Sequence, residues 1–169
     1  SHSLCLKSAT SRRCGNMPLS STTGRYTALT RKAMRICYAA HEGQMDKSGV
    51  PYVFHPIHLA EQMETEEEIC TALLHDVVED TKWTLKELEA EGFPTGVLEA
   101  VRLLTREKDV PYMAYIERLS GNQIARKVKL ADLEHNSDLT RLIEVTERDL
   151  RRQEKYFFAK EFLLRQEDT

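Results

Sequence analysis

The spacing of apolar residues is the feature that most constrains the fold of this chain. From Tyr26 onward, apolar residues recur at intervals of three and four positions, as on one face of an α-helix, and strand-like alternation is nearly absent. Thr65 with Glu68, and Thr84 with Glu87, have the spacing of capping boxes, which mark helix starts. The chain is therefore predicted to be all-α, and its 169 residues suffice for one domain with one core. Helices are expected at about 28–41, 55–63, 96–104, 111–119, 123–136 and 147–166. One more is expected to begin at Thr65 and to carry Ile69, Ala72, Leu73, Val77 and Val78, and a short one is expected between Thr84 and Gly92.

The first part of the sequence differs from the rest. Residues 1–24 are rich in Ser, Thr and Gly and lack periodicity, so they are expected to form a flexible N-terminal arm. Residues 25–169 are expected to form the folded domain.

Composition narrows the class of partner. A formal net charge of -3 is a poor footprint for a nucleic-acid binder, although a few local cations suffice for a small anion. No apolar run has the length of a membrane span. Among the four cysteines there is no CxxC pair, and Cys37 and Cys70 fall in apolar helical patterns, where they are expected to be core residues. A reducing, cytoplasmic location is the expectation that follows.

The segment LLHDVVEDT concentrates ionisable residues directly after an apolar pair. Helical spacing would place Glu79 beside both His75 and Asp76, with Asp80 extending the acidic patch. Burying these groups is costly unless they have partners, and a metal ion is one such partner. The alternative is a solvated helix end, although acidic residues are disfavoured near a helix C-terminus.

Two further segments each carry one polar residue in apolar surroundings. Asp132 interrupts the run VKLADL, with Asn136 one turn further on, and a hydrogen-bonded structural role is an equal alternative to metal binding. His135 is three residues from Asp132, so it is a candidate to join the site or to lie at the surface. His55 follows an aromatic run; taken alone it would more often be a core histidine, which is how His41 and His58 are interpreted.

Together the three segments supply His55, His75, Asp76 and Asp132. Two imidazoles and two carboxylates suit one divalent transition metal with open positions for water, which indicates catalysis. Structural zinc would more usually recruit thiolates, and no cysteine lies in these segments.

The motifs HEGQMDKSGVPYVFHP, ALLHDVVEDT and VKLADLEHNSDL, in this order, resemble the HD hydrolase domain of the RelA/SpoT family in its stand-alone small alarmone hydrolase form. The resemblance implies a compact helical bundle with a buried metal site. It also implies a Mn²⁺-dependent hydrolase, without organic cofactor, that removes the 3′-pyrophosphate from (p)ppGpp-like nucleotides.

The resemblance also implies roles for individual residues. His55, His75, Asp76 and Asp132 would hold the metal, while Glu79 and Asp80 would act on the attacking water. The residues expected to contact substrate are Lys47, Ser48, Tyr52, Asn136, Arg152 and Tyr156. The spacing of Arg152 and Tyr156 places both on one helix face, for which a solvated surface is the alternative. Arg141 is a further candidate to neutralise phosphate charge.

One departure from the family pattern concerns the base. Asp46 stands where family members often carry an Arg that packs on the base, so the sequence leaves guanine and adenine both open. Another HD-type nucleotide phosphohydrolase (an NADPH phosphatase, nucleoside monophosphatase or phosphodiesterase) is the enzymatic alternative. A nucleotide-sensing module without turnover is the non-enzymatic one. The oligomeric state is left open.

Overall fold

The computed structural model describes residues 24–167, and all regular structure within them is helical apart from one isolated bridge between Met45 and Pro51. The all-α prediction is confirmed. The predicted arm lies outside the described residues except for Gly24, and the division into arm and domain stays a prediction. The helices are α1 (Ala28–Ala40), α2 (Phe54–Glu61), α3 (Glu66–Leu74), α4 (Val77–Asp80), α5 (Leu85–Ala90), α6 (Thr95–Leu104), α7 (Tyr112–Ser120), α8 (Gln123–Asn136), the 3₁₀ turn η1 (Leu139–Arg141) and α9 (Glu147–Glu167).

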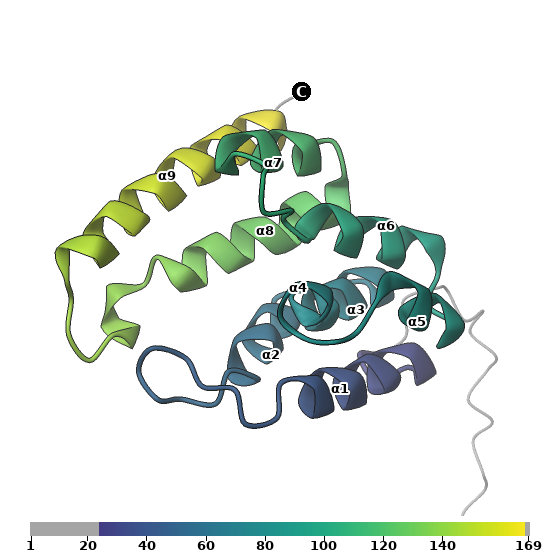
Figure 1. The fold of residues 1–169 in the computed structure, drawn as a ribbon. Helices are drawn as coiled ribbons and strands as arrows, with labels where there is room; N and C mark the ends of the chain where they lie inside the picture. Colours follow the sequence, from purple (N-terminus) through teal and green to yellow (C-terminus); the bar gives the residue numbers. More distant parts are fainter. Residues whose placement is uncertain (1–23, 168–169) are drawn as a thin grey trace, which may run out of the picture.

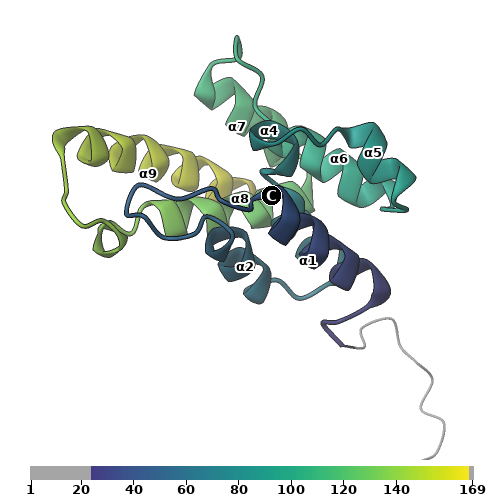
Figure 2. The same cartoon turned by 60° about the horizontal axis from the view of Figure 1, so that its bottom comes forward.

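Helix α3 is the centre of the fold. Every residue from Glu68 to Leu74 is buried, and α1, α2, α6 and α8 pack around this helix (Figure 1). On the far side of α8 lie α7 and α9, and α9 runs back alongside α8 in the opposite direction (Figures 1 and 2). None of the described helices is long and apolar enough to cross a bilayer. The all-round burial of α3 makes it the rigid element to which the polar residues that follow it are attached.

Local sequence accounts for the helix ends. The capping box at the start of α3 is present, with the Glu68 amide donating to Thr65 Oγ1 at 3.1 Å and the Thr65 amide to Glu68 Oε1 at 3.4 Å. At α5 only one of the two capping-box hydrogen bonds forms: the Glu87 amide donates to Thr84 Oγ1. The Glu87 carboxylate accepts from the Thr84 hydroxyl and not from the Thr84 amide. Gly92 has φ +95, which ends this helix as expected, since other residues rarely adopt that conformation. Cys37 and Cys70 are buried free thiols, as predicted.

The helix predicted to run from Thr65 through Val78 is wrong in one respect, because it is interrupted. Helix α3 ends at Leu74, and Asp76, with φ -106 and ψ -1, precedes the short helix α4. The chain turns at this point, so that Val77 enters the core while Glu79 and Asp80 lie exposed. The interruption leaves His75 and Asp76 at the junction of two helices, which determines the geometry of the site.

Candidate metal centre and adjoining pocket

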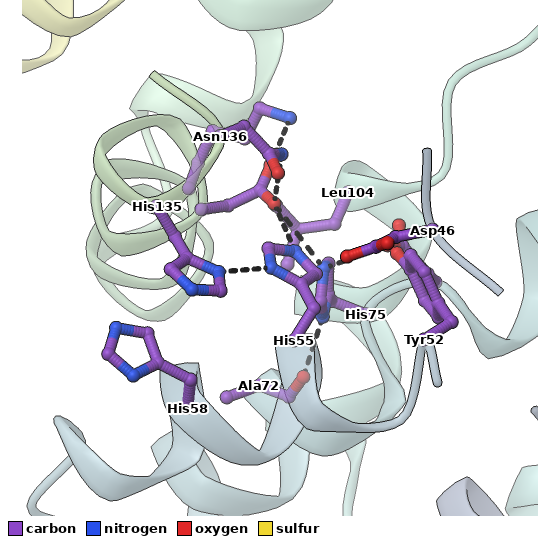
Figure 3. Close-up of polar contacts among 12 residues, drawn as sticks. Asp46, Tyr52, His55, His58, Ala72, His75, Leu104, His135 and Asn136 are labelled. Carbon is purple, nitrogen blue, oxygen red and sulfur yellow. Dashed lines mark hydrogen bonds and ion pairs between the residues drawn. The ribbon is translucent and has the colours of Figure 1, made fainter. Parts of the chain in front are cut away.

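Two imidazoles and two carboxylates meet at the junction of α3 and α4. His55 Nε2 lies 2.8 Å from Asp132 Oδ1, and His75 Nε2 lies 3.0 Å from Asp76 Oδ2 and 3.6 Å from Asp132 Oδ1 (Figure 3). The four side chains come from α2, the α3–α4 junction and α8, and all except that of Asp76 are less than 10% exposed. The four residues predicted as metal ligands are therefore brought together.

The protonation of His75 favours a cation at this point. Its Nδ1 lies 2.6 Å from the Ala72 carbonyl oxygen, which can only accept, so Nδ1 carries the proton. Its Nε2 is buried and, within the described part of the chain, has no hydrogen-bond partner of acceptable geometry, although two carboxylates lie close by. Burial alone would lower the pKa of His75, but Asp76 and Asp132 raise it well above the ordinary value. The arrangement calls for positive charge between nitrogen and oxygen, which a proton or a metal ion supplies.

The donor set fits a divalent ion. Ligand atoms of His55, His75 and Asp76 all lie within 4.8 Å of one another, and Asp132 contacts both imidazoles. Mixed nitrogen and oxygen ligation of this kind is typical of divalent transition metals. The carboxylates remain ionised: although burial opposes it, Lys129 and the two histidines hold the pKa of Asp132 well below its usual range, and His75 lowers that of Asp76.

A second layer of side chains holds these four residues. Lys129 Nζ lies 2.8 Å from Asp132 Oδ2, the Asn136 amide donates to Asp132 Oδ1 at 3.0 Å, and the Tyr52 hydroxyl donates to Asp76 Oδ2. Sequence reasoning missed Lys129. Its position in the run VKLADL, three residues before Asp132, was the available signal, because a lysine in an apolar helical stretch needs an anionic neighbour.

The remaining histidines lie around the centre. His135 Nδ1 is 2.7 Å from His55 Nδ1, so the predicted neighbour of the site contacts a candidate ligand (Figure 3). Burial and then Arg141 lower the pKa of His135 to about 4, which keeps its imidazole neutral. The interpretation as a core residue is wrong for His58, which is exposed and stacks on His135. His41 is buried and packs against Tyr52, and its Nε2 has no hydrogen-bond partner among the described residues.

Glu79 and Asp80 lie beside Asp76, and their carboxylates come within 4.8 Å of one another and of Asp76. Because the helix is interrupted, they do not share one continuous helical face with His75, as the spacing predicted. Glu79 Oε1 accepts from the Arg106 amide at 2.8 Å. Partial removal from water, and then the charge of Asp76, raise the pKa of both carboxyls. A carboxylate with a raised pKa is suited to accept a proton near neutral pH.

A pocket of about 340 Å³ opens next to the centre. All six residues predicted to contact substrate line it, together with Arg141: Lys47, Ser48, Tyr52, Asn136, Arg152 and Tyr156. The loop that carries Lys47 is fixed across the pocket, since the Ser48 hydroxyl donates to the Arg141 carbonyl oxygen at 2.7 Å. Segments nearly a hundred residues apart in sequence thus bring three basic side chains, each paired with an aspartate, to one pocket: Lys47, Arg141 and Arg152.

Asp46 has a structural task in the same loop. Its Oδ1 accepts from the amides of Ser48 at 2.8 Å and Val50 at 3.0 Å, which closes the turn, and its Oδ2 lies 3.8 Å from Arg141 Nη2. A carboxylate therefore lines the pocket where a stacking guanidinium was the family expectation.

No protein-family model matches the chain. The guanosine-3′,5′-bis(diphosphate) 3′-pyrophosphohydrolase MESH1 of Danio rerio is 36% identical over 130 residues, which are 68% of this chain and 71% of that protein. The guanosine-3′,5′-bis(diphosphate) 3′-pyrophosphohydrolase of Haemophilus influenzae is 35% identical over 112 residues, 57% of this chain, and the match spans only 16% of the length of that relative. A solved structure described as a metazoan ortholog of SpoT that hydrolyzes ppGpp has a TM-score of 0.68 and 26% identity, covering 85% of this chain and 88% of that one.

Proposed function

Because this chain belongs to the RelA/SpoT-type HD hydrolases, we propose that it removes the 3′-pyrophosphate from (p)ppGpp-like alarmone nucleotides, with one Mn²⁺ ion, in the cytoplasm. The observation that carries the proposal is the position of two imidazoles and two carboxylates directly beside a pocket lined by three basic side chains. A nucleotide with phosphate groups at the 3′ and 5′ positions of its ribose needs a metal centre for hydrolysis at one position and basic side chains to bind the phosphates.

The residues fit a divalent ion, and His55, His75, Asp76 and Asp132 would hold it. When bound, such an ion supplies the positive charge that activates water and polarises a phosphoryl oxygen. The Nδ1–H of His75 donates to the Ala72 carbonyl oxygen, which leaves Nε2 facing the carboxylates and available to a metal ion. Lys129 and Asn136 donate to the two oxygens of Asp132 and hold this carboxylate in place.

The chemistry assigned to this chain's own groups is proton transfer and charge neutralisation. Glu79 accepts the proton of the attacking water, with Asp80 beside it, while the Arg106 amide fixes one Glu79 oxygen. Attack at the phosphorus next to the 3′ oxygen breaks the bond between them. The products are free diphosphate and a nucleotide with a 3′ hydroxyl, whose oxygen takes up a proton. Lys47, Arg141 and Arg152 neutralise phosphate charge in the pocket.

A turnover panel tests the proposal. Purified protein with Mn²⁺ is offered ppGpp, ppApp, NADPH and nucleoside monophosphates, and products are separated by anion exchange. Release of diphosphate from ppGpp or ppApp supports the proposal and decides the base, which Asp46 leaves open. Turnover of NADPH or of monophosphates alone would favour the other HD phosphohydrolases, and binding without turnover would favour a sensor.

A further inference from the structure

Two cations share one aromatic ring at the edge of the site. Arg106 lies between α6 and α7 and Lys155 lies on α9; Arg106 Cζ and Lys155 Nζ are 5.4 and 4.3 Å from the centre of the Tyr112 ring. Both side chains are largely exposed, and neither forms an ion pair with any carboxylate between residues 24 and 166. Two positive charges on one ring repel each other, and a negatively charged ligand between them would relieve this repulsion.

The surroundings add more positive charge. Partial removal from water lowers the pKa of Lys155, and the charges of Arg106, Arg152 and Lys129 lower it further. Arg106 is oriented by its own loop, because its Nε donates to the Val110 carbonyl oxygen at 3.1 Å while its amide contacts Glu79. The cluster is therefore built on fixed backbone and is adjacent to the candidate base.

The hydroxyl of Tyr112 is buried and has no hydrogen-bond partner among the residues that the structure describes. An unpaired buried hydroxyl is costly unless a ligand or water satisfies it. Burial raises the pKa of Tyr112 to about 12, so this group is a donor at neutral pH. Its ring lies 6.2 Å from that of Tyr156, which lines the 340 Å³ pocket, so the cluster adjoins the pocket at Tyr156.

We propose that Arg106, Lys155 and the Tyr112 hydroxyl form an anion subsite for the terminal phosphate of a diphosphate group. The identity of the whole substrate rests on the proposed function, whereas the subsite itself requires only a diphosphate. A nucleotide in the pocket would then reach past Tyr156 with its distal phosphate, and the enzyme would distinguish a diphosphate from a monophosphate at the hydrolysed position. Neither cation was singled out by the sequence, because their meeting depends on the packing of α7 against α9.

Direct binding of inorganic pyrophosphate tests the subsite without turnover. Manganese-loaded protein is titrated calorimetrically with inorganic pyrophosphate and with inorganic phosphate, and its metal content is measured before and after. The variants are Lys155→Gln, Arg106→Gln and Tyr112→Phe, each checked by circular dichroism. Lys160→Gln, five residues further along α9 and bound to Glu134 at the surface, is the matched control.

The expected result is about tenfold weaker pyrophosphate binding in Lys155→Gln and Arg106→Gln, the usual contribution of a charge-assisted hydrogen bond, and a several-fold loss in Tyr112→Phe. Phosphate binding and metal content should change by less than about twofold, since the subsite contacts only the distal group. Pyrophosphate affinity within twofold of wild type in both Lys155→Gln and Tyr112→Phe would overturn the subsite, as would an equal loss in Lys160→Gln. A protein that binds pyrophosphate through these residues yet hydrolyses no alarmone keeps the subsite and refutes only the proposed function.

Discussion

The Lys129 ammonium lies 2.8 Å from Asp132 Oδ2, and these two side chains are only 13% and 7% exposed. We expect Lys129→Met to lower the free energy of unfolding of metal-free protein by about 3 kcal/mol, because it leaves a buried carboxylate without its counter-charge. Urea denaturation measures this, and Lys160→Met, which breaks an exposed pair, should cost less than about 0.5 kcal/mol. Added Mn²⁺ should recover part of the loss. A cost below about 1 kcal/mol for Lys129→Met would show that Asp132 has sufficient compensation without it.

Asp76 is the least buried of the four candidate ligands, and its Oδ2 is 3.0 Å from His75 Nε2. Asp76→Ala should reduce bound metal from about one ion per chain to near zero, since it removes a charged ligand. Activity should fall with it by at least about 10³-fold. Metal analysis after gel filtration provides the measurement, with Asp109→Ala in an exposed loop as control. Full metal occupancy together with full turnover in Asp76→Ala would refute the ligand assignment.

Glu79 is positioned by the Arg106 amide, a contact that a glutamine oxygen can also accept. Glu79→Gln should therefore keep the loop and the metal but lose the base, so that kcat falls by roughly 10²–10⁴. Steady-state kinetics beside metal analysis checks this. Loss of metal would make Glu79 a ligand, and near-normal kcat would direct attention to Asp80.

The contrasting variant for Glu79→Gln is Lys47→Ala. Lys47 lines the pocket, and its ammonium lies 3.5 Å from Asp149. A phosphate-binding cation contributes to both the ground state and the transition state, so this variant should mainly raise KM. The two variants together separate binding of the phosphate from activation of the water.

The thiols of Cys37 and Cys70 provide a test that depends on pH. Burial, together with Asp76 for Cys37 and nearby glutamates for Cys70, raises the pKa of each thiol to about 12 from 9.0. At pH 9 the reactive thiolate should be about 10³-fold scarcer than in unfolded chains, and alkylation of these two cysteines should be slower accordingly. Folded protein keeps these protons as pH rises from 9 towards 12, so stability contributed by the neutral thiols decreases over that range. The labelling rate of each cysteine with iodoacetamide is measured by mass spectrometry of its peptide, with urea-unfolded protein as control. Equal labelling rates in the folded and unfolded states would contradict the burial of these thiols.

Much of the fold followed from sequence because helical period and caps are local properties. Helix α8 occupies the predicted range, and Thr65 with Glu68 forms the predicted box. The interruption at His75 and Asp76 could not be read from periodicity, since Val77 and Val78 continue the apolar pattern across it. The resemblance to the RelA/SpoT family, carried by three motifs, is confirmed by the relatives.

The candidate site was predictable where a polar residue interrupts an apolar run, as Asp132 does. The substrate-contact residues came from the resemblance, and their position in one pocket supports those roles without testing them. The cluster of Arg106, Tyr112 and Lys155 combines side chains from the α6–α7 loop, α7 and α9, and no local sequence pattern connects these three segments.

The contact between His55 and Asp132 also bears on how the chain folds. It joins residues 77 positions apart, and closing a loop of that length carries an entropic cost that local helix formation does not. We therefore expect the ionisable groups of the centre to stay hydrated until α8 docks on α2, so that the cost of removing this water falls late in folding. If the centre assembles after the helices have formed, substitutions in it should change the unfolding rate more than the folding rate.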